Sequence, residues 1–99
     1  MAKNVNGVAG IISVDELGET LMHEHVLCGN TGWYADFTRW PFDRDAAIKA
    51  AVKTMGELKA CGVNTYVDAT PNDLGRDAIL LEEVSEKSGM NIICSTGLY

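Results

Sequence analysis

The sequence lacks the features typical of disordered chains, membrane proteins and secreted proteins. Only two of its 99 residues are proline and no low-complexity tract occurs, which argues against an extended disordered chain. No apolar stretch approaches the roughly 20 residues of a membrane-spanning helix, and the first residues lack the apolar core of a signal peptide. We therefore expect a globular cytoplasmic protein with no membrane partner.

Cysteines and basic residues are also scarce. Cys28, Cys61 and Cys94 are odd in number and none forms a CxxC pair, which disfavours a zinc ribbon or a disulfide framework. We expect Cys61 and Cys94 to be small buried hydrophobic residues. Eight basic residues stand against 14 acidic ones, and the net charge of −6 argues against a nucleic-acid partner.

Strand and helix patterns alternate along the chain. In order, the patterns predict a hairpin over about 5–14, a strand over 20–25, a helix over 45–60, a strand over 64–69, a helix over 77–87 and a strand over 91–95. On the second helix we expect Ile79, Leu80 and Val84 to face inward. Asp43 or Asp45 can cap the start of the first helix.

The connection over 26–42 contains five aromatic residues, which is unusual for a loop. Two interpretations stay open and are compatible with each other. The rings can cap the end of a core, or they can form a pocket wall beside the end of the first strand.

This alternation predicts parallel strands joined by right-handed crossovers. A closed barrel of eight strands and eight helices takes roughly 250 residues, so three strands and two helices are only part of one. We expect an α/β fold, the N-terminal portion of a (β/α)8 TIM barrel, with residues 1–99 as a fragment of a single domain. A free-standing three-stranded sheet is conceivable, but one of its faces would be poorly covered.

Both histidines of the chain, His23 and His25, lie at the end of the first predicted strand. Side chains alternate faces along a strand, so the two imidazoles point the same way and Glu24 points the other. Two adjacent imidazoles are suited to a divalent metal, and active sites of α/β barrels lie at the carboxyl ends of the strands. The pair is therefore a candidate metal site.

Four stretches together resemble the phosphotriesterase family of the amidohydrolase superfamily. They are Gly18-Glu19-Thr20-Leu21-Met22-His23-Glu24-His25, Gly62-Val63-Asn64-Thr65-Tyr66-Val67-Asp68, Leu74-Gly75-Arg76-Asp77 and Thr96-Gly97-Leu98-Tyr99. The resemblance implies a barrel with two divalent metals, usually zinc, of which His23 and His25 would bind one. A carboxylated lysine, two histidines and an aspartate would come from later strands that these residues do not include.

The implied activity is hydrolysis of lactones, carboxylic esters or phosphotriesters by a hydroxide that bridges the metals. No catalytic residue of this scheme lies in the 99 residues, so the isolated chain is expected to be inactive. An alternative is a non-catalytic fragment or interaction module, whose unfinished sheet would associate through its edges. The full-length form could be a homodimer.

The resemblance also implies two substrate-binding residues. Tyr99 matches a position at the pocket mouth, where the family's lactonases carry tyrosine, which favours lactones or related small esters; it could also be only a chain-end aromatic. Trp33 belongs to the aromatic connection and is a candidate for the pocket wall. Asp68 could support a metal-binding histidine or make an ordinary loop hydrogen bond.

Overall fold

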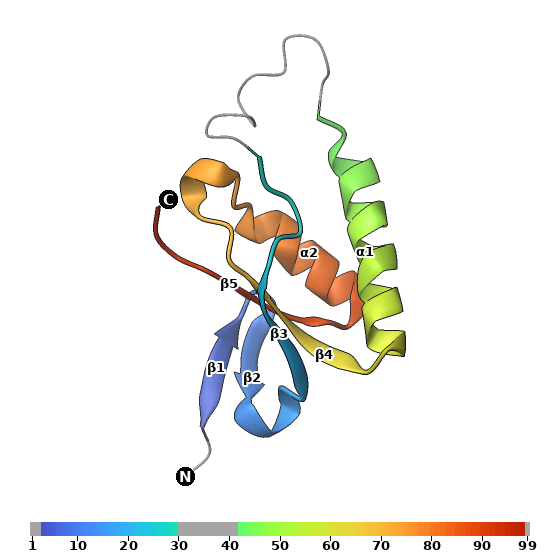
Figure 1. The fold of residues 1–99 in the computed structure, drawn as a ribbon, viewed down its shortest axis with the longest axis vertical. Helices are drawn as coiled ribbons and strands as arrows, with labels where there is room; N and C mark the ends of the chain where they lie inside the picture. The colour runs from blue at the N-terminus through green and yellow to red at the C-terminus, as the bar shows by residue number, and fades with distance from the viewer. Residues whose placement is uncertain (1–2, 30–41, 99) are drawn as a thin grey trace.

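The computed structural model describes residues 3–29 and 42–98 (Figure 1). In chain order its elements are β1 (Asn4–Gly7), β2 (Gly10–Ser13), the 3-10 turn η1 (Val14–Glu16), β3 (Glu19–Glu24), α1 (Arg44–Ala60), β4 (Val63–Asp68), the 3-10 turn η3 (Asn72–Leu74), α2 (Ala78–Ser88) and β5 (Asn91–Cys94). The predicted order of strands and helices is confirmed, with the ends of β3, β4, β5 and the two helices displaced by one residue at most.

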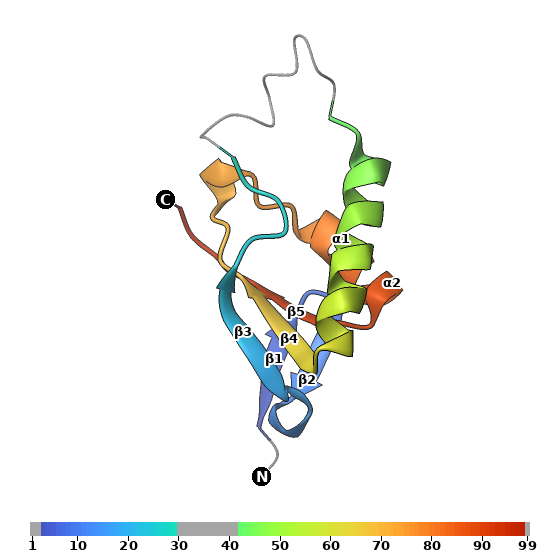
Figure 2. The ribbon, with the colours of Figure 1, turned by 45° about the vertical axis from the view of Figure 1, so that its right-hand side comes forward.

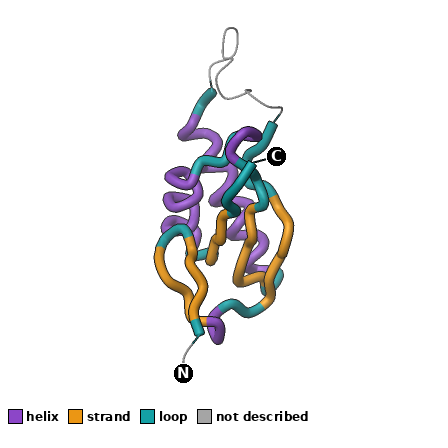
Figure 3. The backbone as a smooth tube through the Cα atoms, turned by 90° about the vertical axis from the view of Figure 1, so that its left-hand side faces the viewer, coloured by secondary structure: helices purple, strands orange, loops and turns teal. Residues whose placement is uncertain are grey.

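Three parallel strands form the central sheet, in the order β3-β4-β5. Glu24, Asp68 and Cys94 are paired across it, so the three strands end at one edge. The antiparallel hairpin of β1 and β2 lies by the amino ends of these strands (Figure 3). The Val8 amide in its turn donates to the Ile92 carbonyl at 2.8 Å, which attaches the hairpin to β5.

Both helices cover the same face of the sheet, as Figure 2 shows. The side chains buried between the two layers are Ile48, Met55, Val63, Tyr66, Leu80, Leu81, Val84, Met90 and Ile92. No helix covers the opposite face within the described residues. Parallel sheets are generally covered on both faces, so the uncovered face is the notable feature of this sheet.

The prediction that Ile79 faces inward is wrong, because its side chain is 75% exposed. Leu80, Leu81 and Val84 are the buried apolar residues of α2. With about 100° per residue, Ile79 lies almost opposite the centre of that stripe. Leu80 and Val84 are buried as predicted.

The helix ends follow from local residues. Asp43, rather than Asp45, caps α1 by accepting from the Ala46 amide at 3.0 Å. Asp77 caps α2 through the Leu80 amide at 3.0 Å. Gly89 ends α2 with φ +76°, a left-handed conformation that glycine adopts without steric cost.

Cys61 and Cys94 differ in how far their side chains are exposed to solvent. Cys61 is exposed at the end of α1, so the prediction that it is buried is wrong. Cys94 is half-buried and packs against the core. In the described part of the chain, neither helix is long and apolar enough to cross a membrane.

Candidate metal centre at the carboxyl end of the sheet

The two histidines lie together where β3 ends. Their ring centroids are 5.5 Å apart and the ring planes meet at 74°, an edge-to-face arrangement. Both residues are exposed. The structure therefore brings the two imidazoles to the same side, at the edge where parallel α/β sheets carry their active sites.

An irregularity in β3 accompanies this orientation. Leu21 pairs with Tyr66 and Glu24 with Asp68, so three steps along β3 match two steps along β4. Leu21 packs against the core beneath the helices. In a regular strand His23 would share the face of Leu21, and the extra residue turns it to the other face.

Thr70 contacts the second histidine directly. Its Oγ1 lies 2.8 Å from Nδ1 of His25, whereas Thr70 itself is only 1% exposed. Thr70 lies just beyond β4, so this contact joins the ends of two neighbouring strands. The sequence analysis did not identify Thr70. Its position just after the second predicted parallel strand, whose end lies beside that of the histidine strand, could have indicated it.

Asp68 organises the same two connections. Its Oδ2 accepts from the Val26 amide at 2.9 Å and its Oδ1 from the Thr70 amide at 2.8 Å. Asp68 is 1% exposed, so these hydrogen bonds satisfy a carboxylate removed from water. Of the two roles predicted for Asp68, the structure shows the loop hydrogen bonds and places them next to His25.

The donor set present fits part of a metal site. Imidazole is a good ligand for zinc and similar divalent metals, and Thr70 occupies only Nδ1 of His25. Among the described residues, no group of three or more His, Cys, Asp or Glu side chains could hold a metal ion. Zinc sites use at least three protein ligands, so the histidine pair alone is an incomplete set.

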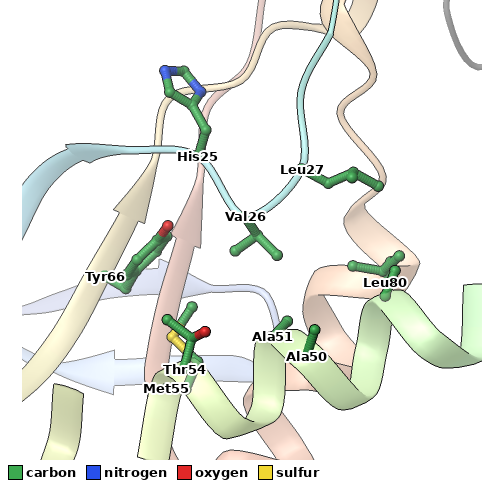
Figure 4. Close-up of a pocket in the computed structure, with 10 residues that line it drawn as sticks. His25, Val26, Leu27, Ala50, Ala51, Thr54, Met55, Tyr66 and Leu80 are labelled. Atoms are coloured by element: carbon green, nitrogen blue, oxygen red, sulfur yellow. The ribbon is translucent and has the colours of Figure 1, made fainter. Parts of the chain in front are cut away.

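A cavity of about 240 Å³ lies on the helix side of the sheet. Its lining includes His25 itself, together with Val26, Leu27, Ala51, Met55 and Tyr66. The ring of His25 points away from this cavity, as Figure 4 shows. His25 therefore borders the cavity, while its imidazole lies on the side away from it.

Tyr66 lines the cavity, and its hydroxyl points towards the chain segment that carries His25 (Figure 4). Burial raises the pKa of its hydroxyl to about 12, with Asp68 and Glu24 adding to the rise and a hydrogen bond with the His25 backbone opposing it. The phenolate is thus disfavoured in the folded protein.

Folding stability should therefore fall at high pH. The contribution of Tyr66 is fully present below pH 10, the ordinary pKa, and is lost between pH 10 and about 12. The loss approaches about 1.4 kcal/mol per pH unit in that window. Urea unfolding at pH 9 to 11 should show a steeper decline for the wild type than for Tyr66→Phe. Equal slopes would contradict the assignment.

Two of the predicted site residues, Trp33 and Tyr99, lie outside the described residues. The same holds for the aromatic connection apart from Phe42, which packs against the core. The proposed contacts of Trp33 and Tyr99 with substrate stay predictions.

The sequence pattern of the phosphotriesterase family matches residues 3–99. The chain belongs to the phosphotriesterase family. This family member is 39% identical over 95 residues to a phosphotriesterase homology protein of Mycobacterium tuberculosis, covering 96% of the chain and 29% of the relative. It is 33% identical over 90 residues to an aryldialkylphosphatase of Saccharolobus solfataricus, covering 89% of the chain and 28% of that relative.

The solved structures agree. A crystal structure of a mutant of the PTE-like lactonase from Deinococcus radiodurans superimposes with a TM-score of 0.91 and 46% identity. It covers 95% of this chain and 29% of the lactonase. The predicted fold class, a portion of a (β/α)8 barrel opened by a hairpin, is confirmed. The chain spans less than a third of these relatives' length.

Proposed function

We propose that the chain is part of a metal-dependent hydrolase of the phosphotriesterase family, with His23 and His25 as two of its metal ligands. The observation that carries the proposal is the imidazole pair, 5.5 Å apart at the carboxyl end of β3, in a chain of this family. The incomplete ligand set fits a chain that spans 29% of a relative. The remaining ligands would come from later strands.

The position of β3 supports the assignment of residues 1–99 to one larger barrel domain. This strand lies at one edge of the three-stranded sheet, and the helices cover a single face. Edges of sheets offer unpaired backbone groups for further strands. The alternative, a non-catalytic module that uses this edge for association, predicts no hydrolytic activity in any form of the protein.

The names of the relatives indicate the class of substrate. One is a lactonase and another an aryldialkylphosphatase, so we propose lactones, carboxylic esters or phosphotriesters as substrates. Tyr99 and Trp33 are the proposed substrate contacts. Two bound divalent metals, zinc in our proposal, would act as Lewis acids on the ester oxygen and on the attacking water. The role of this chain would be to orient His23 and His25 for one of those metals.

The test is hydrolysis by the protein as it occurs naturally. We expect turnover of a lactone, a carboxylic ester or a phosphotriester, loss of that turnover with a chelator, and its recovery on adding zinc. Heat-inactivated protein with the same zinc concentration controls for catalysis by free metal. Zinc-loaded protein that hydrolyses none of the three substrates would overturn the proposal and favour the non-catalytic alternative.

A further inference from the structure

Thr70 is held from three sides at the end of the sheet. Its amide donates to Asp68 Oδ1 at 2.8 Å, its carbonyl accepts from Ser95 Oγ at 2.9 Å, and its hydroxyl lies 2.8 Å from His25 Nδ1. These partners come from the ends of β4, β5 and β3. A residue with 1% exposure and three such contacts has little freedom, so its hydroxyl is a fixed partner for the imidazole.

The backbone of the histidine segment is fixed relative to Thr70 as well. Asp68 Oδ2 accepts from the amide of Val26, the residue directly after His25, at 2.9 Å. The Glu24 carbonyl, directly before His25, accepts from the Ala69 amide at 2.8 Å. His25 is therefore anchored on both sides to the chain that carries Thr70.

The chemistry of the contact allows two arrangements. A neutral imidazole has one N–H and one free lone pair, and a threonine hydroxyl can donate or accept. When Thr70 accepts, the proton is on Nδ1 of His25 and the lone pair is on Nε2. When Thr70 donates, Nε2 carries the proton and cannot bind a metal.

We infer that Thr70 accepts from Nδ1–H of His25, and that it is a positioning residue which selects the tautomer with Nε2 free for a metal. This rests on the proposed function for the metal itself. Metal-binding histidines generally donate their other N–H to an oxygen, which fixes the ring and its tautomer. Within the described residues the ring of His23 has no such hydrogen bond. In this part of the chain, only the ring of His25 therefore has its orientation and tautomer set by a neighbouring side chain.

The tautomer can be measured by ¹⁵N NMR of the metal-free natural protein labelled at histidine, at a pH where the rings are neutral. The signals of His25 and His23 are assigned from the His25→Ala and His23→Ala variants. We expect the wild type to carry its proton on Nδ1 of His25. Thr70→Val keeps the branched shape but removes the hydroxyl, and it should move the proton towards Nε2 while the His23 signals stay unchanged. A wild type with the proton on Nε2 would overturn the inference without any variant.

Zinc affinity gives a second measurement. Loss of a hydrogen-bond partner of a metal-binding histidine typically lowers affinity about 10- to 100-fold, which we expect for Thr70→Val. Thr70→Ser keeps the hydroxyl and should retain both the tautomer and most of the affinity. Thr65→Val is the matched control, because Thr65 is also fully buried but donates to the Leu17 carbonyl, far from His25.

The outcomes separate this inference from the proposed function. An unchanged His25 tautomer in Thr70→Val, or an equal change in Thr65→Val, would contradict the positioning role. A wild type that has Nδ1–H at His25 but binds no zinc would support the positioning role and contradict the proposed metal site.

Discussion

If the proposed function holds, the His25→Ala variant of the natural protein is expected to lose the proposed divalent metal and to hydrolyse the proposed ester substrate at least about a hundredfold more slowly than the wild type. The same is expected of His23→Ala. Each change removes one of two imidazoles whose rings lie 5.5 Å apart, and no third ligand group within the described residues can replace it. Metal content measured by mass spectrometry, together with initial rates at saturating zinc, provides the readout.

A neighbouring truncation controls for general damage to β3. Met22 precedes His23 on the same strand, and its side chain is 69% exposed. Met22→Ala should keep its metal and most of its activity, with circular dichroism spectra unchanged for all three variants. Full metal content in either histidine variant would contradict the assignment of that histidine as a ligand. An equal loss of metal in Met22→Ala would mean that the change perturbs the strand rather than removing a ligand.

The second large effect is expected on stability. Asp68→Ala should lower the free energy of unfolding by about 3 kcal/mol or more, because it leaves two backbone amides, those of Val26 and Thr70, without their acceptor. Each unsatisfied buried donor costs about 1–3 kcal/mol. Since Asp68 is 1% exposed, water does not readily replace the lost carboxylate. Urea denaturation of the natural protein measures the change.

Asp15 offers a matched control, because it is an exposed aspartate in η1. Asp15→Ala should change the free energy of unfolding by no more than about 0.5 kcal/mol, as for most surface substitutions. If Asp68→Ala were as stable as Asp15→Ala, the hydrogen bonds from Val26 and Thr70 would not contribute to the fold as described.

From the position of Asp68 we expect stability and the geometry of the histidine site to be coupled. One carboxylate joins the segment directly after His25 to the residue that contacts the His25 ring. A change that loosens this link should disturb the imidazole even though it removes no ligand. Thr70 variants, which keep Asp68 intact, distinguish the hydrogen bond to the ring from the anchoring of the backbone.

Local features of the sequence were sufficient for the order of the elements. The apolar stripe of α1, the caps at Asp43 and Asp77 and the stop at Gly89 depend on residues within one or two turns of each other. The spacing of His23 and His25 likewise placed both rings at the end of one strand. The predicted order of elements, a cap at Asp43 and the place of the two histidines agree with the structure because they depend on residues close together in the sequence.

The tertiary structure decided what depends on the pairing of distant segments. The extra residue in β3 that turns His23 away from the face of Leu21 exists only relative to β4. The contacts of His25 with Thr70 and of Val26 with Asp68 join residues 45 and 42 positions apart, so they require a particular strand register. The inward prediction for Ile79 was wrong for a different reason, because at about 100° per residue Ile79 does not share a helix face with Leu80 and Val84. The sequence by itself determined that two imidazoles stand together at a strand end, whereas the register of β3 against β4 determined which way they point and what holds them.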